Sequence, residues 1–178
     1  MTFKKEFWTL LSIFLLPIGL GTLFFYLNPS YFSQNTVNYG ELISPVIVTE
    51  KSDIELLGDA TLDGIWTFAY VTESCDAICD KSIEDVKTIR TLINIDMRRI
   101  QRVLIAKDGS RPSQEDDSLI HARIKNEELS GKLASFPKHS IFLIDPIGNF
   151  MLYYNPIDIN VKFVLKDLKR LLKYSRIG

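Results

Sequence analysis

The chain has 178 residues, of which 46% are hydrophobic and 24% charged, and its formal net charge is -1. This size suits one globular domain with a small appendage, and the charge lacks the basic excess that nucleic-acid binding requires. The sequence has no glycine-rich phosphate loop, no HExxH motif and no Ser/His/Asp order, so nucleotide and hydrolase chemistry have no support.

The first feature along the chain is an uncharged apolar run at residues 7–27. As a helix it would be about 31 Å long, which matches a bilayer core of about 30 Å. Lys4 and Lys5 precede it, so the positive-inside bias places residues 1–6 in the cytoplasm. A cleaved signal peptide is the alternative, but the run is long for one and no small-x-small cleavage site follows it. We therefore expect a single-pass anchor in a bacterial inner membrane, with the C-terminal domain in the periplasm.

After the anchor, residues 28–39 form a polar linker without periodicity, and we expect the folded domain to occupy residues 40–178. Residues 46–48 are its first candidate strand. The stronger signal is the apolar run Trp66 to Val71, which is β-branched and aromatic and is bounded by polar turn residues. This pattern predicts a buried strand.

Two cysteines, Cys75 and Cys79, follow this strand and are the only ones in the chain. From Cys79 onward the apolar residues recur with helical spacing, so the pair lies where a strand leads into a helix. The first turn of a helix stabilises a thiolate, and a four-residue spacing lets two sulfurs form a disulfide or hold one soft metal ion. A structural disulfide and a pair of unreactive core thiols remain alternatives.

The remaining elements complete an α/β domain. A short apolar run, residues 102–106, predicts a second strand and thus a βαβ unit, and residues 119–133 are a candidate helix. Residues 141–144 and 150–154 flank a turn with Pro146 and Gly148, which predicts a β-hairpin. The last helix, from Val161, has an apolar stripe opposite a cationic face; a helix that closes the sheet is favoured over one that binds a membrane surface. This order is that of a thioredoxin-like fold.

The motifs also resemble those of a known family. Cys75, Cys79, His139 and the turn 145–148 are similar in order to motifs of the Sco (SenC-type) copper chaperones, which are membrane-anchored proteins that serve cytochrome c oxidase. Segments 38–42, 75–79, 102–104 and 167–173 resemble proteobacterial single-span proteins associated with assembly of this oxidase. The resemblance covers the chain from about Asn38 to its end. It implies a thioredoxin-like fold, copper as the metal, and a subunit of the oxidase or its assembly factors as the partner.

His139 is the third candidate metal ligand, because two thiolates and one imidazole suit Cu(I). An ordinary surface histidine is the alternative. The chain departs from the Sco pattern: Asp76 and Asp80 replace prolines, and residues 107–111 replace an aspartate-rich segment. With Glu73, these two aspartates should raise the pKa of both thiols through like-charge repulsion. The other histidine, His121, is expected on a polar helix in contact with solvent.

Three functional classes follow from these residues. The favoured one is an assembly factor that binds copper through Cys75, Cys79 and His139, or that keeps the cysteines of the oxidase copper site reduced. The second is a general periplasmic thiol-disulfide oxidoreductase, in which Cys75 attacks and Cys79 resolves. The third is a membrane scaffold without catalytic activity, in which the two cysteines form a structural bond.

Overall fold

The structure is a computed structural model and describes residues 3–28, 38–114, 116–175 and 177. It divides into two compact units, Met1–Val37 and Asn38–Gly178, which are described separately. Most of the expected linker, residues 29–37, lies outside the described residues.

The described part of the first unit is a single helix, α1 (Phe3–Leu27), followed by Asn28. It is long and apolar enough to cross a membrane, judged by length and composition. The serine and threonine hydroxyl groups of this helix are satisfied within it: Thr9, Ser12 and Thr22 each donate to the carbonyl oxygen four residues earlier. Internal hydrogen bonds of this kind are what an apolar solvent requires of a helix.

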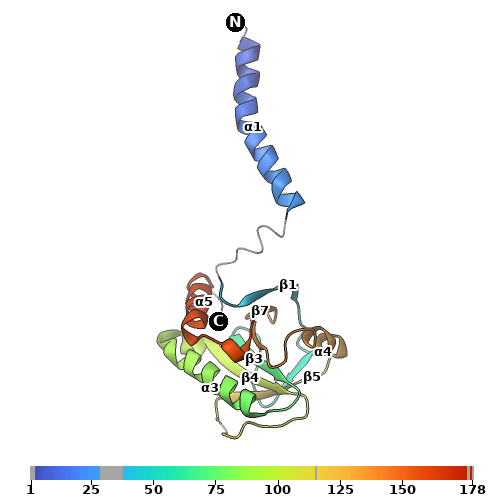
Figure 1. The fold of residues 1–178 in the computed structure, drawn as a ribbon, viewed down its shortest axis with the longest axis vertical. Helices are drawn as coiled ribbons and strands as arrows, with labels where there is room; N and C mark the ends of the chain where they lie inside the picture. Colours follow the sequence, from blue (N-terminus) through green and yellow to red (C-terminus); the bar gives the residue numbers. More distant parts are fainter. Residues whose placement is uncertain (1–2, 29–37, 115, 176, 178) are drawn as a thin grey trace. The chain divides into compact units, whose positions relative to one another are not determined.

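The second unit is built on a mixed sheet (Figure 1). Its described residues form seven strands in the order β1-β7-β6-β3-β4-β5-β2. The three strands β3 (Trp66–Thr72), β4 (Ile100–Ala106) and β5 (Leu119–Ile124) are parallel to one another. The other four pair antiparallel with their neighbours: β1 (Glu41–Ile47), β2 (Ile54–Leu56), β6 (Ile141–Ile144) and β7 (Phe150–Tyr154).

Helices cover both faces of this sheet. Helix α3 (Ala77–Leu92) and helix α5 (Val161–Tyr174) share one hydrophobic core with alternate residues of β3, whereas α4 (Glu127–Leu133) packs into a second core on the opposite face. Two short 3-10 helices, η1 (Asn94–Arg99) and η2 (Pro156–Asp158), precede β4 and α5. The β3–α3 junction therefore follows the end of a strand that is packed on both faces.

The structure confirms the thioredoxin-like fold with its βαβ unit, hairpin and closing helix. Both hairpin strands have the predicted bounds. In the turn between them the Asp145 carboxylate accepts the backbone N–H groups of Ile147 and Asn149, and Gly148 has a φ of 100°. Asp145 thus serves the turn.

The expected helix at residues 119–133 is wrong in its first half. Residues 119–124 form strand β5, because Leu119 and Ala122 are buried beside β4, and α4 begins only after Asn126, whose side chain caps it. His121 accordingly lies in a strand, half-buried, rather than on a polar helix. The first strand also begins five residues before the predicted 46–48, at Glu41.

Candidate functional site

The two cysteines form a disulfide at the junction of β3 and α3. Their Cα atoms are 5.1 Å apart, within the range of about 4.4–6.8 Å that such a bond requires. Helix α3 begins at Ala77, so Cys75 precedes the helix and Cys79 lies in its first turn. Cys79 is completely buried and Cys75 is half-buried. Cys75 is therefore the member of the pair with exposed surface.

Asp76, between the cysteines, caps helix α3. Its carboxylate accepts the backbone N–H groups of Ile78 and Cys79, both at 3.0 Å. The hydrogen bond from Cys79 is the main reason that the pKa of Asp76 lies below its usual value. A negative charge therefore stands at the positive end of the helix dipole, on the residue that follows Cys75 and in contact with the backbone of Cys79.

The polar loop after β4 folds back onto this junction. Ser110 Oγ accepts the backbone N–H of Cys75 at 2.6 Å. Ser113 donates to the Asp80 carboxylate through its N–H (2.8 Å) and its hydroxyl (2.6 Å). Loop 107–118 thus holds both the residue before the helix and the first turn of the helix.

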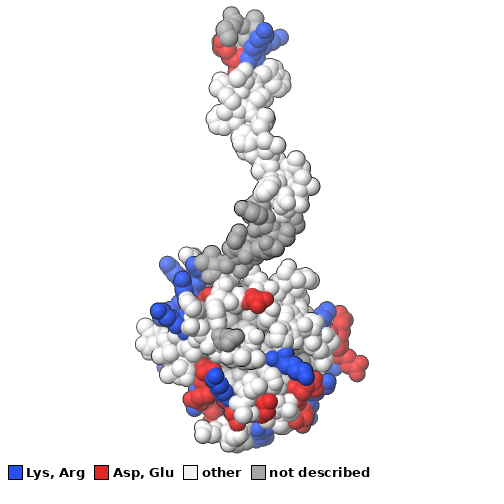
Figure 2. Space-filling model, viewed as in Figure 1, with Lys and Arg blue, Asp and Glu red and all other residues white. Residues whose placement is uncertain are grey.

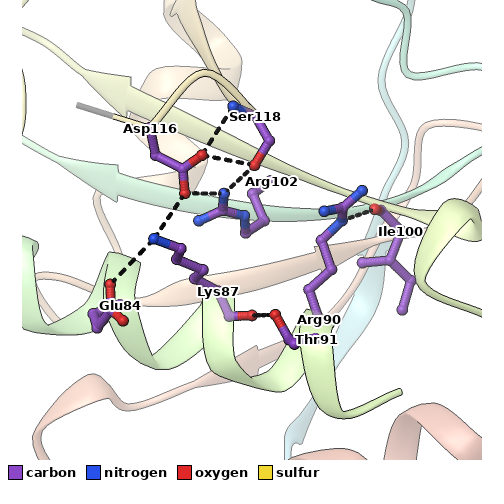
Figure 3. Close-up of polar contacts among 8 residues, drawn as sticks. All are labelled: Glu84, Lys87, Arg90, Thr91, Ile100, Arg102, Asp116 and Ser118. Atoms are coloured by element: carbon purple, nitrogen blue, oxygen red, sulfur yellow. Dashed lines mark hydrogen bonds and ion pairs between the residues drawn. The ribbon is translucent and has the colours of Figure 1, made fainter. Parts of the chain in front are cut away.

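The far end of the same loop is fixed by a buried ion pair (Figure 3). Arg102 of β4 is 2% exposed and donates to Asp116 at 2.7 Å and to Ser118. Asp116 also lies 3.4 Å from the Lys87 ammonium of α3. Nearby, Arg90 donates from Nε to the Ile100 carbonyl oxygen at 2.7 Å. Strand β4, helix α3 and the loop are therefore joined by one polar network.

His139 lies just before β6 and extends toward the cap of α3. Its Nδ1 is 2.8 Å from the Tyr70 hydroxyl, and its Nε2 is 4.0 Å from Oδ2 of Asp76. Burial raises the pKa of Tyr70 to about 12, so this hydroxyl stays protonated near neutral pH. The backbone of His139 has a φ of 66°, a left-handed conformation that is uncommon outside glycine. Such strain is frequent at functional sites.

A groove of about 570 Å³ opens beside this histidine. Ser74, Asp76 and His139 line one part of it, and the ends of β3, β4 and β5, helix α4 and the loop at residues 136–138 line other parts. Among the described residues, no three His, Cys, Asp or Glu side chains lie close enough together to hold a metal ion. In the disulfide state the sulfurs are bonded to each other, so they are not available as thiolate ligands.

Residues 66–175 match the family model described as "Transmembrane-like, thioredoxin-like, C-terminal domain", which is more than half of the chain. The chain belongs to this family. Comparison with curated protein sequences gave no match.

Members of the Sco group are among the solved structures that this thioredoxin-like domain resembles. Copper-bound ScoI of Bradyrhizobium japonicum has 17% identity and a TM-score of 0.51, with 69% of this chain and 98% of that chain covered. Yeast Sco1 with copper bound has 15% identity and a TM-score of 0.54, with coverage of 72% and 94%. Apo Sco1 from Thermus thermophilus has 14% identity and a TM-score of 0.51, with coverage of 77% and 98%. At these identities the likeness shows a shared fold.

The structure brings His139 to the helix cap between the two cysteines, and it adds three residues that the sequence did not indicate. Tyr70, Ser110 and Asp116 reach the site through tertiary contacts only. Asp76 could have been found as a cap, because an aspartate before a helical pattern is a start signal. Ser110 and Asp116 lie in a polar loop without periodicity, so no sequence signal marked them.

Proposed function

We propose that this family member is a membrane-anchored, Sco-like assembly factor for cytochrome c oxidase. It would bind copper through Cys75, Cys79 and His139, or maintain the thiol state of the oxidase copper site. The observation that carries the proposal is the CxxxC disulfide at the β3–α3 junction, with the His139 imidazole directed at the intervening Asp76.

The donor set suits copper as cargo. Reduction of the disulfide takes two electrons and two protons and gives two thiols, which lose their protons on metal binding. Two thiolates favour the soft Cu(I) ion, and an imidazole can supply a third ligand. The acid beside the sulfurs, Asp76, raises the thiol pKa but also attracts a cation.

The exposure of the two cysteines supports a thiol-disulfide role for the same site. Half-buried Cys75 can be attacked, or can attack a partner disulfide, while buried Cys79 is placed to resolve the mixed disulfide. The groove beside His139 is lined by Ser74 and Asp76, the two neighbours of Cys75 in the chain, and offers space for a partner segment. A general periplasmic oxidoreductase would use the same two steps, so the partner distinguishes the two functions.

The topology is part of the proposal. Residues 1–6 would be cytoplasmic, 7–27 would form the anchor in a bacterial inner membrane, 28–39 would be the linker, and 40–178 would be the periplasmic domain. Helix α1 and the transmembrane-like family support a single span. The partner would then be a periplasm-facing subunit of the oxidase, or one of its assembly factors.

Titration of the reduced, detergent-solubilised chain with Cu(I) against a competing chelator tests the copper function. We expect one Cu(I) per chain. Replacing an outer-shell partner of a metal site typically costs about 10–100-fold in affinity, so Cys75→Ser or Cys79→Ser should cost at least that much, and His139→Ala about tenfold. His121→Ala is the matched control, because His121 is the other histidine and lies in β5; its affinity should equal that of wild type.

Equal binding by wild type and the Cys75→Ser/Cys79→Ser variant would exclude copper binding at this site. Oxidase assembly in cells that carry the double variant then tests the thiol function, and we expect the copper site of the oxidase to be underloaded. Normal assembly in those cells would leave the scaffold as the remaining function.

A further inference from the structure

Helix α5 has two chemically opposite faces. Val164, Leu168 and Leu172 are buried against the sheet and α3. The solvent face carries five cationic side chains: Lys162, Lys166, Lys169, Arg170 and Lys173. Figure 2 shows blue side chains gathered over the helix at the upper left of the domain.

Nothing in the described part of the domain neutralises these charges. Among the described residues, no carboxylate lies within ion-pair distance of any of the five. Asp167 is the one acidic residue of α5, and it is buried and accepts the N–H groups of Tyr39 and Gly40. Lys162, Lys166 and Arg170 follow one another at four-residue spacing, where like charges destabilise a helix. Helix stability therefore does not account for this face.

Exposed aromatic rings accompany the cations. Phe163 is 46% exposed, Tyr174 is 76% exposed and Tyr39 is 40% exposed. Tyr39 and Phe163 pack together with ring centroids 5.4 Å apart. Aromatic rings beside cationic side chains are typical of surfaces that lie in the headgroup region of a membrane.

The chain also enters the domain at this helix. Through Asp167, α5 binds the backbone of Tyr39 and Gly40, at the start of the compact unit. Asn38 is ten residues after Asn28, which follows α1, and ten residues span at most about 36 Å. With α1 in a bilayer, the covalent link keeps α5 within reach of that membrane surface. An acidic protein would not be held near α5 by a covalent link, so a lipid surface is the favoured partner.

We propose that the cationic face of α5 binds the anionic phospholipid headgroups of the membrane in which α1 is anchored. The contact would hold the domain at the membrane surface through charge, with Phe163 and Tyr39 at the interface. It involves neither cysteine nor His139, and it is independent of copper binding and thiol chemistry.

Lysine acetylation of the full chain in nanodiscs tests the proposal. One set of discs contains phosphatidylcholine alone, and the other contains phosphatidylcholine with phosphatidylglycerol. Mass spectrometry gives the acetylation rate of each α5 lysine relative to Lys107 and Lys138, which are exposed elsewhere on the domain. We expect the α5 lysines to react several-fold more slowly in the anionic discs only, and this protection to vanish at about 1 M salt, where the Debye length is about 3 Å.

A pair of charge-matched variants makes the test specific. Lys166→Glu/Arg170→Glu should abolish the protection of the remaining α5 lysines, whereas Lys51→Glu/Lys81→Glu should retain it; circular dichroism verifies the fold of both. Equal acetylation in the two kinds of disc would overturn the proposal, as would protection that persists at high salt. Protection that appears only in native membranes containing other proteins would point to an acidic protein and would also overturn it.

Discussion

At the scale of single residues, Arg102 is the most unusual side chain of the domain. It is the largest of the fully buried side chains among the described residues, and its Nε and Nη1 atoms have no partner there. Its charge is balanced by Asp116, whose pKa would be raised by burial but is held well below its usual value by hydrogen bonds from Ser118 and Arg102. The carboxylate is thus the group that makes a buried arginine tolerable.

Asp116→Asn should therefore destabilise the domain by about 3–5 kcal/mol, because it leaves a buried guanidinium without its counterion. Asp117→Asn is the control: this neighbouring carboxylate is exposed, and its loss should change stability by no more than about 0.5 kcal/mol. Chemical unfolding of the detergent-solubilised, oxidised chain at pH 7 measures both. Equal stabilities of the two variants would show that the ion pair contributes nothing.

The same ion pair predicts that the stability of the domain depends on pH. The folded-state pKa of Asp116 is depressed below the ordinary 3.8. The contribution of ionised Asp116 to the free energy of unfolding is therefore complete above about pH 4. It is lost as the pH falls through the lower folded-state pKa. The stability difference between wild type and Asp116→Asn should shrink in acid, and unfolding measured from pH 6 downward, in steps of about one unit, would show it. A difference that stays constant down to strong acid would contradict the assignment.

At the scale of elements, the start of α3 determines the chemistry of the thiols. The dipole of the helix favours a thiolate at Cys79, but the Asp76 cap brings a negative charge to the same place. The capping hydrogen bond and the charge can be separated, because a serine hydroxyl caps a helix nearly as well as an aspartate.

Asp76→Ser should therefore keep α3 capped and lower the pKa of the reduced thiols, since like-charge repulsion is removed. We expect the reduced variant to be alkylated several-fold faster than wild type at pH 7, with the rate profile shifted to lower pH. Mass spectrometry after iodoacetamide treatment gives the rate for each cysteine. Glu73→Gln is the control, because Glu73 is exposed and pairs with Lys107, and it should have a smaller effect. Unchanged rates in Asp76→Ser would show that the cap has no electrostatic influence on the thiols.

The sequence predicted elements where the periodicity was local. Strand β3 extends one residue beyond its prediction, and both hairpin strands match. Strand β5 was missed because its six residues mix buried and half-exposed positions without strict alternation. The loop on the site was missed for another reason: Ser110 and Cys75 are 35 positions apart in the chain. Contacts of that kind depend on the fold and leave no local pattern.

At the scale of the whole molecule, the sequence combines one apolar helix with one thioredoxin-like domain. The family model matches the domain, and its description as transmembrane-like agrees with α1. The division into a cytoplasmic segment (residues 1–6), a membrane anchor (7–27) and a linker (28–39) remains a prediction. Whether the apolar helix is an anchor or a cleaved signal decides if the CxxxC site works at a membrane or free in the compartment.

Lys4 and Lys5 lie in the first turn of α1, ahead of its apolar run, and no matching cations directly follow the helix, so the positive-inside bias predicts a cytoplasmic N-terminus. A reporter that is active only in the periplasm should work when fused after Gly178, and Lys4→Glu/Lys5→Glu should reduce its activity by misorienting a fraction of the chains. Lys51→Glu/Lys81→Glu is the control with the same change of charge beyond the helix, and it should leave the reporter active.

The intact chain of 20.4 kDa should remain with the membrane pellet after a high-salt wash, because an apolar helix that spans the bilayer is not held by charge. Mass spectrometry of the purified protein distinguishes an anchor from a signal peptide. Loss of the first 27 or so residues, together with release of the domain into the soluble fraction, would show that α1 is cleaved. In that case no covalent link would hold the cationic face of α5 near a membrane.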